Sequence, residues 1–139
     1  MKTAPLLPLT KLVLVVSVVV QVVMALAGFV APDLTRALLS PSTQSPTIAV
    51  YYVAGFYLAG AVGAAYAFRQ NVWIAARTYL ASAFALISIF AIITIAGALM
   101  PPGLEPISWL YVLLSVLYLP VVAWVWRQES ARTASVEAG

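Results

Sequence analysis

The sequence predicts an all-α integral membrane protein, a four-helix bundle whose successive helices run up, down, up and down. Hydrophobic residues make up 64% of its 139 residues and charged residues only 8%, whereas charged residues are about a quarter of a soluble domain. The apolar residues also gather in four long runs, and a helix needs about 20 such residues to cross a bilayer. We therefore expect one membrane domain, in the cell (plasma or inner) membrane, with no soluble catalytic domain.

The four runs predict four membrane spans in chain order, joined by short polar segments. The spans cover about residues 12–31, 48–68, 72–99 and 107–126, and a polar tail, residues 127–139, follows them. The tail has too few apolar residues to fold alone. We expect it to be solvated on the cytoplasmic side.

The first span has a second interpretation. Lys2 and Lys11, an apolar core over residues 12–23 and the small residues 25–27 also resemble a secretory signal with a cleavage site. Against cleavage, the apolar run continues through Ala31 and is long enough to cross a membrane. We expect a retained span.

The second span carries small residues at every fourth position. Helices in lipid associate through close van der Waals approach, which such stripes permit. We therefore expect a neighbouring helix to lie along this stripe, although glycine is also common in membrane helices for no specific reason. The predicted helix-packing residues are Gly55, Ala59, Gly60, Gly63 and Ala67.

The second half of the chain forms a predicted hairpin followed by a last span. The turn at residues 69–71 is so short that the second and third spans must be antiparallel neighbours. Arg77 lies near the start of the third span. It either extends to the inner interface or, as a buried cation, binds an anionic headgroup or carboxylate.

Pro120 lies inside the fourth span, where we expect a kink.

The basic residues predict the orientation. With both termini in the cytoplasm, six basic residues lie inside and Arg36 alone lies outside, as the positive-inside rule requires. The six are Lys2, Lys11, Arg69, Arg77, Arg127 and Arg132.

The chain contains no histidine and no cysteine, and this limits the kinds of catalytic and metal-binding site that it can form. Imidazole and thiolate are the usual ligands of zinc and haem and the usual bases and nucleophiles of enzymes. We therefore expect no catalytic residue, no cofactor, no metal site and no nucleic-acid binding. No acidic residue lies within a predicted span. Small multidrug carriers of similar size depend on a glutamate in the membrane, so we do not expect this chain to be one of them.

Neutral polar residues form a predicted layer near the middle of the membrane. They either fix the helix register through hydrogen bonds or hold a ligand such as a quinone or a lipid. The layer consists of Gln21, Ser88, Ser115 and Tyr118.

Several short motifs resemble those of a known group. They are Tyr57-Leu58-Ala59-Gly60, Arg77 at the start of the third span, Trp109-x-Tyr111, Tyr118-Leu119-Pro120 and Trp126-Arg127. In this order they resemble small uncharacterised four-helix bacterial membrane proteins, some of them loosely grouped as DoxX-like. The resemblance implies the four-helix topology and no activity.

Two functional hypotheses follow. The first is a non-enzymatic membrane protein that acts through helix association, as an accessory or structural subunit of a membrane complex or as a homo-oligomer. Its partners would be the lipid bilayer and other membrane subunits or itself. The alternative is binding or transport of an apolar or neutral ligand, a lipid or a quinone, inside the bundle.

Overall fold

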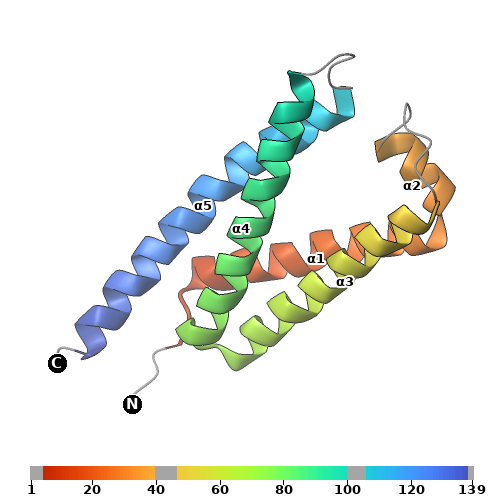
Figure 1. Ribbon diagram of the computed structural model, residues 1–139. Coiled ribbons are helices and arrows are strands. Elements are labelled where there is room, and N and C mark those ends of the chain that lie inside the picture. Colours follow the sequence, from red (N-terminus) through yellow and green to blue (C-terminus); the bar gives the residue numbers. More distant parts are fainter. Residues whose placement is uncertain (1–4, 40–46, 100–105, 138–139) are drawn as a thin grey trace.

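The computed structural model describes residues 5–39, 47–99 and 106–137, and Figure 1 shows their arrangement. These residues form five helices and no strand. The helices are α1 (Pro8–Val30), α2 (Pro32–Leu39), α3 (Thr47–Gln70), α4 (Trp73–Ala98) and α5 (Pro106–Glu137). The predicted all-α class is confirmed.

Three of these helices, α1, α3 and α4, are long and apolar enough to cross a membrane. Helices of this length and composition are typical of an integral membrane protein. The passage of a fourth helix, α5, through the membrane and the placement of both termini inside stay predictions.

Two helix starts differ from the sequence prediction. Helix α1 begins at Pro8, before the predicted span, because proline fits the first helical position, where no backbone N–H is needed. Helix α2 covers eight residues of the polar segment that joins the first two predicted spans. Asp33 and Arg36 form an ion pair at 3.5 Å on one side of it. Residues 40–46 and 100–105, which belong to the predicted outer loops, lie outside the described residues.

The predicted polar tail continues a helix, and although most of its described residues are exposed, one face of it packs against the chain. Helix α5 continues from the apolar run to Glu137, and the side chain of Glu129 is completely buried. The inward face explains the difference, since Tyr118, Val122, Val125 and Glu129 recur at three- and four-residue spacing. The segment does not need to fold alone, because it continues a helix that already packs against the chain.

The long helices form two antiparallel pairs. Helices α1 and α3 lie side by side, and so do α4 and α5. The pairs meet at one end and diverge toward the other (Figure 1). We call the meeting end the base. It holds the start of α1, the connection between α3 and α4, and the second half of α5.

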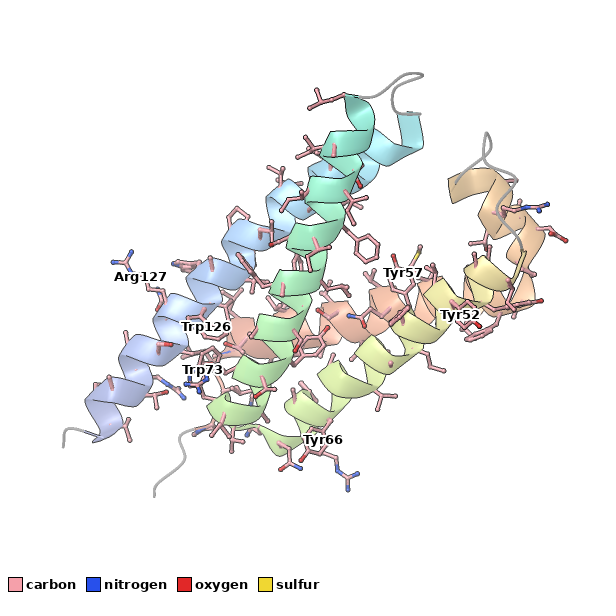
Figure 2. All side chains as sticks on the ribbon, viewed as in Figure 1. Tyr52, Tyr57, Tyr66, Trp73, Trp126 and Arg127 are labelled. Atoms are coloured by element: carbon pink, nitrogen blue, oxygen red, sulfur yellow. The ribbon has the colours of Figure 1, made fainter. Side chains whose placement is uncertain are left out.

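The buried apolar core lies at the base. Trp73 of α4 meets Trp126 of α5 edge to face, with ring centroids 5.5 Å apart (Figure 2). Away from the base, the large side chains of α4 and α5 are mostly exposed, Ile92 and Leu117 among them. The core consists of Leu6, Val13, Leu14, Ala64, Ala67, Trp73, Ala76, Leu80, Val122 and Val125.

Small residues bring α1 and α3 close together. Gly28 of α1 faces Ala54 of α3 so closely that a Cβ at position 28 would lie 2.7 Å from the Ala54 Cβ. A Cβ at Gly55, on the other side of α3, would have nothing within 4 Å. Gly28 is therefore packed tightly against the neighbouring helix, whereas Gly55 has free space beside it.

This contrast gives a prediction. Gly28→Ala should force α1 and α3 apart and lower the free energy of unfolding by about 1–3 kcal/mol relative to Gly55→Ala, as overpacking does in other cores. Both variants gain the same helix propensity, so their difference isolates the clash. Unfolding in mild detergent, followed by circular dichroism, measures it. Equal stability of the two variants would contradict the close approach at Gly28.

Candidate functional site

The connection between α3 and α4 holds the segment that precedes α1. Asn71 ends α3 with a φ of 52°, a left-handed conformation that asparagine tolerates better than most residues. Its N–H bonds to the Ala67 carbonyl at 3.2 Å, and its side-chain Oδ1 accepts the Leu6 N–H at 3.2 Å. Pro5 also pairs with Val72 in an isolated β-bridge. The turn therefore fixes the path of the chain into α1.

Glu129 of α5 binds the same segment from the opposite side. Its Oε1 accepts the Leu7 N–H at 2.8 Å and the Thr10 hydroxyl at 2.6 Å. Leu7 is the N-cap of α1 and supplies no side-chain cap of its own. A carboxylate near a helix N-terminus also meets the positive end of the helix dipole. Glu129 thus supplies from α5 the negative group that the start of α1 lacks.

Arg132 lies one turn after Glu129. Its Nη2 lies 3.7 Å from Glu129 Oε2 and donates to the Pro5 carbonyl. Oε2 is buried, and among the described atoms it has no hydrogen-bond partner. Arg132 therefore offsets its charge. We call Leu6, Leu7, Thr10, Asn71, Glu129 and Arg132 the clasp.

The clasp does not have the arrangement of a catalytic site. The Thr10 hydroxyl donates to a carboxylate, as a nucleophile does to a base, but Thr10 is only 1% exposed and Glu129 is 0% exposed. Within the part of the chain that the structure describes, no three acidic, histidine or cysteine side chains gather as metal ligands. The clasp can hold together the start of α1, the connection between α3 and α4, and the second half of α5.

The predicted polar layer divides into two separate contacts. Gln21 of α1 donates to the Tyr79 hydroxyl of α4 at 2.6 Å, and the Tyr118 hydroxyl of α5 lies 3.3 Å from Ser17 Oγ. Both contacts join α1 to the other helix pair. The two other predicted members, Ser88 and Ser115, are half-buried on α4 and α5.

Sequence reasoning missed the partners in these contacts. Ser17 precedes Gln21 by one helical turn, so its place on the inward face of the first span was visible. Tyr79 lies near the start of the third apolar run, a position typical of an aromatic residue at the membrane interface. The pairing itself depends on how α1 crosses α4 and α5, which no local pattern specifies.

The predicted stripe of α3 does not pack as a unit within this chain. Ala67 is buried, the Gln21 side chain fills the space beside Gly60, and the Tyr79 ring lies beside Gly63. Gly55 and Ala59, in contrast, face open space or the surface. The buried side of α3 instead follows a different set of alanines, Ala54, Ala61, Ala64 and Ala67.

Arg77 is exposed on α4. The alternative of a cation buried within this chain does not describe its position, and both extension to the inner interface and contact with an anion stay predictions.

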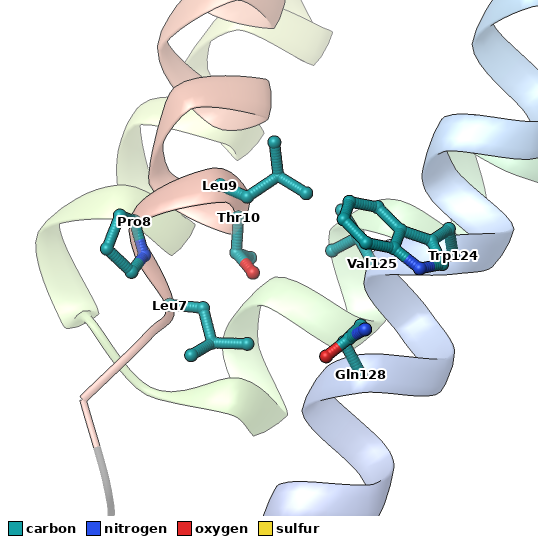
Figure 3. A pocket seen from close by; sticks show the side chains of 7 residues that line it. All are labelled: Leu7, Pro8, Leu9, Thr10, Trp124, Val125 and Gln128. Atoms are coloured by element: carbon teal, nitrogen blue, oxygen red, sulfur yellow. The ribbon is translucent and has the colours of Figure 1, made fainter.

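A shallow groove of about 300 Å³ lies at the base beside the clasp (Figure 3). It separates the first turn of α1 from the second half of α5, and its walls are mostly apolar. Trp124 lies toward the apolar part of α5 and Gln128 toward its polar end. The lining residues are Leu7, Pro8, Leu9, Thr10, Trp124, Val125 and Gln128.

Comparisons with models of protein families, with curated proteins and with solved structures find no match. The resemblance to DoxX-like proteins therefore stays an expectation. The function has to be argued from the residues themselves.

The clasp gives a prediction about stability. Glu129→Ala should lower the free energy of unfolding by about 2–4 kcal/mol, because it leaves the Leu7 N–H, the Thr10 hydroxyl and Arg132 without their acceptor. Glu129→Gln keeps one acceptor oxygen and should cost less. Chemical unfolding in detergent is the measurement.

Gln128→Ala is the matched control for this change. Gln128 is the exposed neighbour of Glu129 on the same helix, and its truncation should alter stability by no more than about 0.5 kcal/mol. A Glu129→Ala variant as stable as Gln128→Ala would show that the clasp contributes nothing.

Proposed function

We propose that this chain is a non-enzymatic integral membrane protein that works by association, as an accessory or structural subunit of a membrane complex or as a homo-oligomer. Two properties of its polar groups support this function. Gln21 and Tyr118 have partners within the chain, and the Glu129 carboxylate is buried in the clasp. These groups connect helices and are not presented to a substrate.

The observation that carries the proposal is an open face on α3. Tyr52, Val62 and Tyr66 along this face are all at least 60% exposed, and the two tyrosines lie along α3 in Figure 2. Between them lie Gly55, beside which a Cβ would meet nothing within 4 Å, and the exposed Ala59. A glycine and an alanine four residues apart permit a partner helix to approach the α3 backbone closely.

The open face predicts the effect of a bulky side chain on association. Ala59→Leu should abolish or strongly reduce the chain's oligomer or its co-purifying partner, because the leucine prevents close approach to the α3 backbone. Size-exclusion chromatography with light scattering, after extraction from native membranes in mild detergent, measures the effect.

Ala65→Leu provides the matched control, since Ala65 is also exposed on α3 but lies away from this face. It should leave the association intact. A wild-type chain that purifies as a strict monomer without a partner, or equal loss in both variants, would refute the proposal.

The proposal includes four spans with both termini in the cytoplasm. Its support is the position of the charges, because the described basic residues other than Arg36 lie at the base, where α1 begins and α5 ends. The ion pair of Asp33 and Arg36 on α2 would then face the outside.

Cysteine labelling tests this orientation, since the chain has no cysteine of its own. In intact cells a membrane-impermeant maleimide should label Asp33→Cys and should label Ala131→Cys only after permeabilisation. Both positions are exposed. The opposite pattern would invert the topology, and labelling of both in intact cells would contradict the passage of α5 through the membrane.

The alternative function, binding or transport of an apolar or neutral ligand inside the bundle, has less support. It requires Gln21 and Tyr118 to face a ligand, but each already has a partner on another helix. The described groove lies at the base and not beside these two side chains.

A further inference from the structure

The charged side chains divide the molecule into two unlike ends. At the far end, the described charges are Asp33 and Arg36, which pair with each other. At the base Glu129 is buried and paired with Arg132, and the second described acid there, Glu137, is the last residue of α5. The remaining described charges at the base are positive.

These remaining cations come from four different helices. They are Lys11 of α1, Arg69 of α3, Arg77 of α4 and Arg127 of α5, which we call the collar. Three of them are exposed and Lys11 is half-buried. Figure 2 shows Arg127 directed outward from α5. The described residues contain no ion pair that neutralises any of the four, because both ion pairs found there involve other side chains.

A basic residue on each long helix at the base, three of the four exposed, fits a surface of negative charge. Such side chains attract the headgroups of anionic lipids, and long basic side chains extend from helix ends to this interface. The buried position of Glu129 strengthens the fit, because its carboxylate is withdrawn from the surface and does not repel a phosphate there.

The groove at the base adds an apolar element to this charge. Two of the collar residues are the chain neighbours of groove residues: Lys11 follows Thr10, and Arg127 precedes Gln128. The groove wall itself is made by Leu9, Trp124 and Val125 (Figure 3). Basic residues at the same end of the molecule as an apolar groove suit an amphiphile better than a free inorganic anion.

We infer that the collar and the groove at the base bind the headgroup and the upper acyl chain of an anionic phospholipid. The phosphate interacts with the collar, and the chain lies against Leu9 and Trp124. This inference does not depend on association through the open face of α3, because the two surfaces share no residue.

Quenching of tryptophan fluorescence tests the inference. In a Trp109→Phe background the remaining tryptophans, Trp73, Trp124 and Trp126, all lie at the base. The protein is reconstituted in phosphatidylcholine vesicles that contain the same fraction of either brominated phosphatidylglycerol or brominated phosphatidylcholine. Brominated phosphatidylglycerol should quench several-fold more effectively, because it is enriched beside these residues.

The collar is then neutralised. The fourfold variant Lys11→Gln, Arg69→Gln, Arg77→Gln and Arg127→Gln should lose this excess quenching, whereas exchange of the three arginines for lysine should keep it. Arg36→Gln at the far end is the control and should change nothing. The near-ultraviolet circular dichroism of the Trp73 and Trp126 pair verifies that each variant is folded. If the fourfold variant fails this check, the double variant Lys11→Gln and Arg127→Gln takes its place.

Three results would overturn the inference. The first is equal quenching by the two brominated lipids in the wild-type protein. The second is excess quenching that survives neutralisation of the collar. The third is loss of the excess on addition of inorganic phosphate but not of chloride at equal ionic strength, which would show that the collar takes a free anion.

Discussion

The base of this structure depends on the position of one carboxylate. Glu129 contacts the first turn of α1 and Arg132 from a place with no exposure to solvent. An uncompensated charge in such a place would cost several kcal/mol, so the surrounding groups have to be held in position with it. The Leu7 N–H, the Thr10 hydroxyl and the Arg132 guanidinium meet this requirement, and they come from both ends of the chain. The carboxylate therefore ties the two helix pairs together where they meet.

The long helices could be predicted from the sequence because the membrane constrains them so strongly. In lipid every backbone group has to be satisfied within its own segment, so runs of apolar residues such as 72–99 can hardly be anything but helices. The small turn between α3 and α4 was equally visible in Arg69, Gln70 and Asn71. These features depend on local composition alone.

The clasp could not be predicted in the same way. The segment after Trp126 is polar, and composition alone indicates a solvated tail. The signal was periodicity, since the inward stripe of Tyr118 and Val122 continues through Val125 to Glu129 at the same spacing. Its partners, however, are a backbone N–H and a hydroxyl more than 100 residues away, at Leu7 and Thr10, and no local pattern identifies such contacts. Local spacing also identified the small residues of α3 without indicating which of them the neighbouring helices contact. For this reason the predicted packing stripe differs from the buried side of α3.

The separation between Leu7 and Glu129 has a consequence for how the chain is assembled during synthesis. Helices α1 and α3 contact each other along their length and are close in sequence, so they can pair as soon as both have entered the membrane. The acceptor for the first turn of α1 follows it by more than 100 residues and is made only with α5. Until then the Leu7 N–H and the Thr10 hydroxyl lack this partner. The base therefore cannot close when α1 and α3 pair, but only after the second half of α5 has been synthesised.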